Sequence, residues 1–242
     1  MAATVVIPAR FASTRFPGKI IAADTGIPLV QHVVERARQC RQVREVIVAC
    51  DDQRIVTALR PFGTRCVMTS PEHPSGTDRI AEVAKDLRDD IIVNVQGDEP
   101  EIEPATIDSV IELHVSDMDI GTAAAPFPES ADPADPNLVK VVFTRDFRAM
   151  YFSRSPIPYR RDAHDRVPTY YLHVGIYAYR RAALLRLAEL KPTACELAEK
   201  LEQLRALENG MSIRVSVIEN AAHGIDTPQQ YAAFVSRYRG QK

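Results

Sequence analysis

The feature that most constrains the fold is an alternation of short apolar runs with amphipathic segments through most of the chain. Three of the runs are continuous and rich in β-branched residues: 5–7, 46–49 and 91–95. Runs of this kind suit strands of a parallel sheet that is buried on both faces. Between them, residues 28–40 and 76–87 carry apolar side chains at helical spacing, and Pro28 suits a first turn. This order predicts an α/β fold with a Rossmann-like, doubly wound, mostly parallel central sheet.

The second half of the chain is less regular. Residues 126–137 include four prolines and several acids, and residues 155–168 are rich in proline and arginine. Segments of this composition leave the sheet, and the second is a candidate lid or subunit contact. The remaining periodic segments predict helices at 181–190, 196–208 and 228–238, and a strand at 213–218. We predict a single domain over residues 1–242 in which the two irregular segments are insertions.

The charge balance argues against a surface built for polyanions. With 30 Lys and Arg against 32 Asp and Glu, the formal net charge is −2, so we predict no nucleic-acid partner. No stretch approaches the ~18 apolar residues of a membrane span, and the first apolar run is too short for a signal peptide. The four cysteines show no metal or redox spacing, and Cys50 is expected to be a buried thiol. A cytoplasmic protein without a membrane partner is expected.

A basic loop follows the first predicted strand. Residues 8–19 carry Arg10, Arg15 and Lys19 among small residues and one glycine. Open α/β sheets bind ligands at the carboxyl ends of their strands, where backbone N–H groups can join the cations around a phosphate. The loop therefore suits a triphosphate, although a solvated basic loop would have the same composition. The Walker A pattern is absent, so this is not a P-loop.

Two adjacent acids, Asp98 and Glu99, follow the apolar run at 91–95 almost directly. A strand in that run places them at the same ligand-binding edge of the sheet. Mg²⁺ takes oxygen ligands, typically one or two carboxylates together with substrate phosphates and water. Asp98 fits the first ligand position and Glu99 is an additional candidate.

Residues 171–179 alternate as a half-buried strand does. The pattern places His173 and Tyr177 side by side on one face, with Gly175 leaving room between them. Such a face can hydrogen-bond a polyhydroxylated sugar. The alternatives are a polar face that meets solvent, or a His and Tyr pair that is satisfied within the core.

Four ordered segments carry a resemblance to a known family. The loop at 8–19, Ser-Gly-Thr-Asp-Arg at 75–79, Asn-Val-Gln-Gly-Asp-Glu-Pro at 94–100 and Gly-Ile-Asp-Thr-Pro at 224–228 resemble the 3-deoxy-manno-octulosonate cytidylyltransferases, or CMP-Kdo synthetases. The similarity runs from about residue 4 to about residue 235. It implies transfer of CMP from CTP to 3-deoxy-D-manno-octulosonate (Kdo) with release of pyrophosphate, in an Mg²⁺-dependent reaction that serves lipopolysaccharide biosynthesis. It also implies a homodimer, with the inserted segments in sugar binding or dimerisation.

The same resemblance implies roles for the residues around the nucleotide. Arg10 and Lys19 hold the CTP phosphates and act catalytically with Asp98, and Arg15 assists them. Further nucleotide contacts are implied for Ala9, Ser75, Gln96 and Gly97.

For the metal, the resemblance implies Mg²⁺ ligands at Asp98 and Asp226. Taken alone, Asp226 has a second interpretation, because Thr227 and Pro228 follow it as they follow a helix N-cap. The residues themselves leave both interpretations open.

On the sugar side, the resemblance implies Arg154 for the sugar carboxylate, which an arginine can bind bidentately. It adds His173 and Tyr177 and, on the predicted helix 196–208, a further pair of otherwise exposed residues, Glu202 and Gln203. Arg79 is a second candidate for the carboxylate, the alternative being an exposed helix residue. Ala-Cys-Glu at 194–196 departs from the Pro-Leu-Glu entry that the family often has at this helix.

Three other functions stay open at this point. The same chemistry could serve sialic acid or 8-amino-Kdo, and phosphate-binding loops say little about the base, so ATP, GTP or UTP could replace CTP. The third is a catalytically silent nucleotide-binding module that regulates a partner.

Overall fold

The computed structural model describes residues 2–13, 15–115, 118–128, 131–162, 169–222 and 224–240. The chain divides into two compact units, Met1–Asp108 with Ala222–Lys242 (unit 1) and Ser109–Ala221 (unit 2). The prediction of one domain over the whole chain stays a prediction. Among the described residues, no helix is long and apolar enough to cross a membrane.

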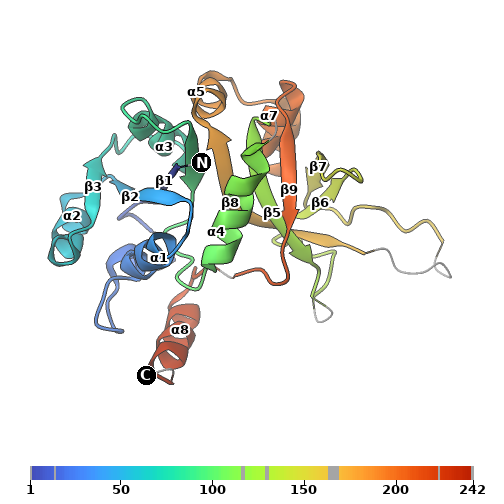
Figure 1. Ribbon diagram of the computed structural model, residues 1–242. Coiled ribbons are helices and arrows are strands. Elements are labelled where there is room, and N and C mark those ends of the chain that lie inside the picture. Colours follow the sequence, from blue (N-terminus) through green and yellow to red (C-terminus); the bar gives the residue numbers. More distant parts are fainter. Residues whose placement is uncertain are drawn as a thin grey trace. The chain divides into compact units, whose positions relative to one another are not determined.

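Unit 1 is built on four parallel strands, in the order β3-β2-β1-β4 (Figure 1). Their bounds are β1 Ala3–Ala9, β2 Val43–Cys50, β3 Arg65–Met68 and β4 Ile91–Asn94. All residues of β4 and nearly all of β1 are buried. The continuous apolar runs therefore form strands covered on both faces, as predicted.

Helices cover both faces of this sheet. Figure 1 shows α1 (Leu29–Arg38) and α2 (Gln53–Leu59) on one side and α3 (Gly76–Ala84) on the other. Right-handed crossovers require this arrangement, because the path from β1 to β3 runs one way across the sheet and the return to β4 runs the other. The predicted fold class, a doubly wound α/β sheet, is confirmed.

The C-terminal helix α8 (Pro228–Gly240) completes unit 1. Its Tyr231, Phe234 and Val235 bury an apolar face against Leu29 at the start of α1. Ile225 joins the same cluster, so the segment just before α8 is fixed to this unit. Helix α4 (Pro104–Glu112) spans the boundary between the two units.

Strand order reverses beside β1, with β2 and β3 to one side and β4 to the other. In doubly wound sheets the crevice for ligands opens at this point, outside the carboxyl ends of the strands. The segments that leave β1 and β4 therefore meet there.

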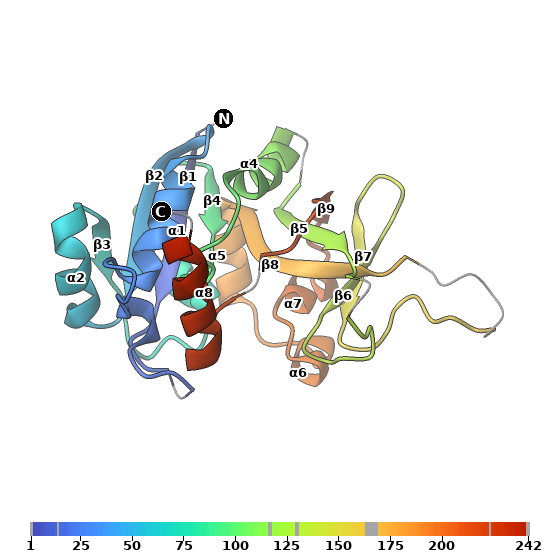
Figure 2. The same cartoon turned by 90° about the horizontal axis from the view of Figure 1, so that it is seen from below.

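Unit 2 contains a mixed sheet (Figure 2). Strand β5 (Ile120–Pro126) pairs antiparallel with β8 (Tyr171–Arg180) and parallel with β9 (Ile213–Val217). Strands β6 (Lys140–Phe143) and β7 (Ala149–Ser153) form an antiparallel pair. The helices of this unit are α5 Arg181–Glu189, α6 Ala194–Glu199 and α7 Gln203–Glu208.

The two irregular segments lie partly outside the described residues. Pro126, the first residue of the predicted excursion, still belongs to β5, whereas 127–128 and 131–137 contain no helix or strand, as predicted. Residues 129–130 are not among the described residues. Residues 155–162 are also without helix or strand, and 163–168 lie outside the described ranges.

The prediction of one helix over 196–208 is wrong. The chain breaks at Lys200, which adopts a left-handed φ of 53°, so α6 ends and α7 begins separately. Leu201 and Leu204 are buried, but Leu197 is 53% exposed, so the three do not form one apolar stripe. The break is stabilised by an ion pair between Arg205 and Glu196, which joins the two short helices.

Gly121 and Gly175 provide a matched test of packing in the sheet of unit 2. A Cβ at Gly121 would lie 2.7 Å from the Val110 carbonyl oxygen, whereas among the described residues nothing lies within 4 Å of a Cβ at Gly175. We expect Gly121→Ala to lower the free energy of unfolding by about 1–3 kcal/mol, and Gly175→Ala to change it little. Urea unfolding measures both, and equal stabilities would contradict the described packing.

Candidate active site

A pocket of about 390 Å³ lies at the carboxyl ends of β1 and β4 in unit 1. Its lining comes from the loop after β1, the segment after β4, the start of α3 and the residue before the α8 cap. The lining residues are Pro8, Arg10, Ala12, Ser13, Arg15, Lys19, Ile20, Gly76, Gln96, Gly97, Asp98 and Asp226. The pocket lies where the strand order reverses, as expected for an open α/β sheet.

The structure brings all three predicted cations to this pocket. Arg10 donates from Nη2 to the His73 carbonyl oxygen at 2.6 Å. Arg15 Nη2 lies 3.2 Å from Asp226 Oδ1 and remains largely exposed. The loop is therefore not a basic surface segment with scattered charges, because its cations converge on one cavity.

Lys19 is the most buried of the three cations, with 12% of its side chain exposed. Its Nζ donates to Asp98 Oδ2 at 2.6 Å and to the Ile225 carbonyl oxygen at 2.6 Å. It also lies 3.4 Å from Asp226 Oδ1. Two acids that are far apart in the sequence therefore meet on a single ammonium group.

The N-cap of α8 is Thr227 and not Asp226. Thr227 Oγ1 accepts the Gln230 N–H at 3.2 Å, and Gln230 Oε1 accepts the Thr227 N–H at 2.9 Å. This is a capping box, which satisfies the end of the helix without the Asp226 carboxylate. The capping interpretation of Asp226 is wrong, and its carboxylate is left to face the pocket.

The donor set of the pocket fits Mg²⁺. Asp98 and Asp226 present carboxylate oxygens to the same point, and one or two carboxylates plus substrate oxygens are the ligands that Mg²⁺ takes in proteins. Within the described ranges, no group of three or more His, Cys, Asp or Glu could hold a metal. Glu99 is buried, and burial together with the neighbouring Asp98 raises its pKa to about 8. A carboxyl group in that environment is a poor metal ligand.

Close backbone packing explains the glycine at position 97. A Cβ there would lie 3.0 Å from the Pro8 carbonyl oxygen and 2.9 Å from Ile20 Cδ1. Only glycine lets the segment after β4 lie this close to the end of β1. Gln96 beside it donates to Asn94 Oδ1 at 3.3 Å.

The two remaining nucleotide candidates do not line the pocket with their side chains. Ser75 is the N-cap of α3, where its Oγ accepts the Asp78 N–H at 3.1 Å. Ala9 is fully buried at the end of β1. Any contact of Ala9 with a ligand would come from its backbone.

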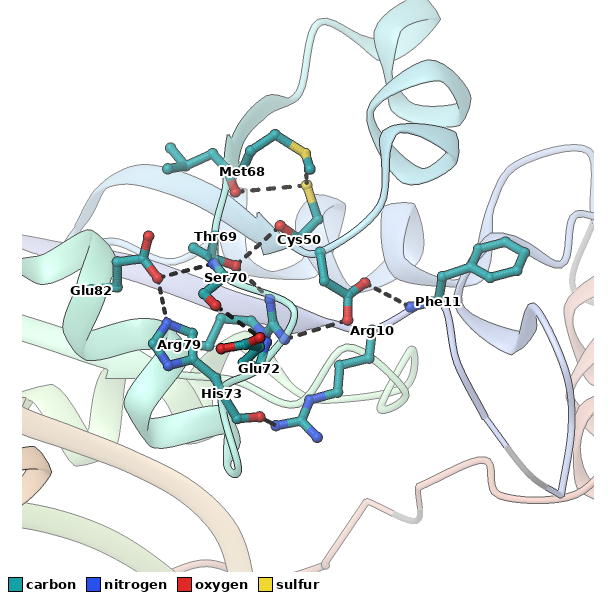
Figure 3. A network of polar contacts seen from close by, with 12 residues as sticks. Arg10, Phe11, Cys50, Met68, Thr69, Ser70, Glu72, His73, Arg79 and Glu82 are labelled. Carbon is teal, nitrogen blue, oxygen red and sulfur yellow. Dashed lines mark hydrogen bonds and ion pairs between the residues drawn. The ribbon is translucent and has the colours of Figure 1, made fainter.

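Arg79 differs from both sequence interpretations. Its side chain is 0% exposed, so the expectation of an exposed helix residue is wrong. It donates to Thr69 Oγ1 at 2.5 Å and lies 3.3 Å from Asp51 Oδ2 (Figure 3). A guanidinium group with no exposed surface is poorly placed for a sugar carboxylate, and that role remains only a prediction.

In unit 2, β8 places His173 and Tyr177 on one face with their rings 5.5 Å apart. His173 Nε2 lies 3.0 Å from Thr122 Oγ1 on β5. Burial lowers the pKa of His173 to about 3, so the ring is neutral near pH 7, and burial raises the pKa of Tyr177. This face offers neutral hydrogen-bonding groups, which suit hydroxyl groups and not a second charge.

The other sugar candidates lie around the break between α6 and α7. The Arg154 guanidinium donates to the carbonyl oxygens of Glu199 and Pro136, each at 2.6 Å. Glu202 precedes α7 and Gln203 is buried in its first turn, so neither is the exposed helix residue that the sequence suggested.

Sequence and structure comparisons agree on one family. The cytidylyltransferase family profile matches residues 4–213. The 3-deoxy-manno-octulosonate cytidylyltransferase of Geobacter metallireducens is 50% identical over 248 residues, covering 98% of each chain. That of Geobacter sulfurreducens is 51% identical over 236 residues, covering 93% of this chain and 94% of its own. This chain belongs to the 3-deoxy-manno-octulosonate cytidylyltransferase family.

A solved structure of CMP:2-keto-3-deoxy-manno-octonic acid synthetase complexed with CTP has a TM-score of 0.94 at 40% identity, and the match covers 100% of both chains. The inositol-1-phosphate CTP transferase of T. maritima has a TM-score of 0.70 at 14% identity, covering 98% of this chain and 96% of its own. The second likeness shows the fold alone. As a cytidylyltransferase, this family member is a nucleotidyltransferase enzyme.

The low pKa of His173 gives a pH test of its burial. Below the ordinary pKa of 6.5 the unfolded chain binds a proton at this ring, and the folded chain does not until about pH 3. Stability is therefore lost as pH falls through this window, by at most about 1.4 kcal/mol per pH unit from this group. In His173→Asn, we expect the unfolding free energy to fall less steeply between pH 6 and about pH 4. Equal slopes in urea titrations would contradict a half-buried ring that stays neutral in the folded chain.

Proposed function

We propose that this chain transfers CMP from CTP to Kdo, giving CMP-Kdo and pyrophosphate. One observation supports this most strongly: Lys19, Asp98 and Asp226 converge in a pocket lined by two further cations. Such a pocket suits a triphosphate with a divalent ion, and the relatives at about half identity are named for this reaction.

The proposed phosphate site is the loop after β1. Arg10, Arg15 and Lys19 supply positive charge, and Gly97 lets the segment after β4 lie against the end of β1 beside them. Gln96 adds a polar side chain beside the nucleotide, and the N–H groups near Ala9 and at the start of α3 after Ser75 add donors. Fixed cations of this kind stabilise the charge that develops on a leaving pyrophosphate.

Asp98 and Asp226 are the residues that would hold Mg²⁺. The three cations and two carboxylates of the pocket leave a net charge of +1 (3 − 2), which is too small to neutralise an ionised triphosphate. A bound divalent ion would supply the missing positive charge at the phosphate oxygens. In the structure Lys19 bridges the two carboxylates, and Arg15 adds a second positive charge beside Asp226.

The proposed sugar ligands are the candidates of unit 2. Arg154 would bind the carboxylate of Kdo, and its backbone and side chain are already held by Glu199. His173 and Tyr177 would hydrogen-bond hydroxyl groups as neutral partners. Glu202 and Gln203 would complete this set from the start of α7.

The proposed step is an in-line displacement. The oxygen of the anomeric hydroxyl forms a bond to the α-phosphorus of CTP, and the bond from that phosphorus to the bridging oxygen breaks. Pyrophosphate takes the electron pair, and the hydroxyl proton passes to solvent. Arg10 and Lys19 stabilise the charge on the phosphate oxygens, so positioning and electrostatics carry the acceleration.

The wider context follows from the same proposal. CMP-Kdo is an activated sugar for lipopolysaccharide, and the chain is proposed to work in the cytoplasm as a homodimer of single-domain subunits. These statements rest on the likeness to the family.

Incubation with CTP, Kdo and Mg²⁺ tests the function through release of pyrophosphate. We expect Asp98→Ala and Asp226→Ala each to lower kcat/KM by about 100-fold or more, because each removes a carboxylate that would hold the divalent ion at the phosphates. Asp89→Asn is the matched control, since Asp89 binds Thr4 and Arg44 outside the pocket and its loss should leave turnover unchanged.

Two results would contradict the proposal. One is faster turnover with sialic acid, 8-amino-Kdo, ATP, GTP or UTP than with the proposed pair. The other is full activity in both aspartate variants.

A further inference from the structure

A buried ion pair lies behind the phosphate loop and has no part in the proposed chemistry. Arg79 on α3 is 0% exposed and Asp51, directly after β2, is 12% exposed. Arg79 Nη2 lies 3.3 Å from Asp51 Oδ2, and Arg79 Nη1 donates to Thr69 Oγ1 at 2.5 Å. The pair therefore joins the ends of β2 and β3 to α3.

The second oxygen of Asp51 reaches the phosphate loop. Asp51 Oδ1 accepts the N–H of Phe11 at 3.0 Å. Phe11 is the neighbour of Arg10, so this bond fixes the direction in which the chain leaves β1. We propose that Asp51 is a positioning residue that aims Arg10 at the triphosphate, with Arg79 holding Asp51 in place. This inference rests on the proposed function, because it assumes that Arg10 binds phosphate.

A second contact holds the guanidinium end of the Arg10 side chain. Its guanidinium donates to the His73 carbonyl oxygen at 2.6 Å, and the His73 ring contacts Glu82 on α3 (Figure 3). Glu82 also accepts the Ser70 N–H at 3.1 Å. The segment 69–73 is thus tied to α3 at both ends, and Arg10 is held between two supports that both depend on this helix.

The energetics favour a positioning role over a stabilising one. A buried ion pair recovers little net stability, because the cost of removing both charges from water offsets their attraction. An apolar pair of similar volume would stabilise the fold at least as well. The ion pair instead fixes the orientation of the Asp51 carboxylate. That carboxylate in turn holds the Phe11 N–H and the Arg79 guanidinium within hydrogen-bonding distance.

Asp108 provides a matched control. It is also a buried carboxylate, and it accepts the N–H groups of Arg41 and Gln42 at 3.1 and 3.2 Å while pairing with the Arg41 side chain. It therefore makes the same kind of contact as Asp51. Arg41 and Gln42 precede β2, however, so Asp108 acts at the opposite edge of the sheet from the pocket.

A double-mutant cycle on CTP binding, measured by calorimetry with Mg²⁺, tests the positioning role. We expect Arg10→Ala and Asp51→Ala each to weaken CTP binding by about 10- to 100-fold, since each loses a charge-assisted phosphate contact. The double variant should bind no more weakly than the weaker single variant, because both changes remove the same contact. Asp51→Asn keeps an acceptor for the Phe11 N–H and should recover part of the loss.

Two further readouts separate positioning from general loss of structure. The KM for Kdo should stay within about twofold of the wild-type value in Asp51→Ala, because the change acts on the nucleotide. The control variant Asp108→Ala should have a lower thermal stability than the wild type. Its affinity for CTP should equal that of the wild type. If Asp51→Ala does not fold, Arg79→Met takes its place in the cycle with the same expected non-additivity.

The positioning role is overturned if Asp51→Ala binds CTP as tightly as the wild type, or if the losses in the double variant multiply. A wild-type chain that fails to bind CTP overturns the proposed function itself, and the positioning role with it. The wild-type measurement therefore tells the two failures apart.

Discussion

The ammonium group of Lys19 is the point on which the site depends. It lies at the end of the loop after β1, and its partners come from the segment after β4 and the residues before α8. The first two segments meet because the strand order reverses beside β1, and the third is held there by the packing of Ile225 and α8 around Leu29. The fold therefore brings these segments together, and the ion pairs of Lys19 keep the Asp98 and Asp226 carboxylates close despite their mutual repulsion. A charge so little exposed requires such partners, since leaving it unpaired would cost several kcal/mol.

Residues around the pocket also help to hold its lining residues in position. Gly97 removes the side chain that would hold β1 and the segment after β4 apart. Thr227 and Gln230 cap α8, which leaves the Asp226 carboxylate for the pocket. Asp51 and Arg79 support the loop from behind. These residues hold the backbone around the pocket in place, so that the side chains that line it can contact a ligand.

The sequence predicts several of the strands but misses others, and particular residues show why. Continuous apolar runs identified β1, β2 and β4, because the runs are short and rich in β-branched residues, which favours a strand over a buried helix. The four-residue β3, by contrast, carries too little pattern. The break at Lys200 was missed because a lysine gives no local sign of a left-handed turn.

Within the site, the cations and Asp98 were predictable because they lie in the segments that follow β1 and β4, at the carboxyl ends of the strands. The pairing of Arg79 was not, since its partners Asp51 and Thr69 come from other strands and only the fold brings them together. For Asp226 one local signal was available: Gln230 stands three residues after Thr227, which favours Thr227 as the cap.

The most direct test of the central claim is a crystal structure with CTP and Mn²⁺ in place of Mg²⁺, with the metal located by anomalous scattering. We expect a metal peak within coordination distance of both Asp98 and Asp226, and Lys19 Nζ in contact with a phosphate oxygen. A metal peak elsewhere on the chain, or CTP phosphates bound away from Lys19, would contradict it.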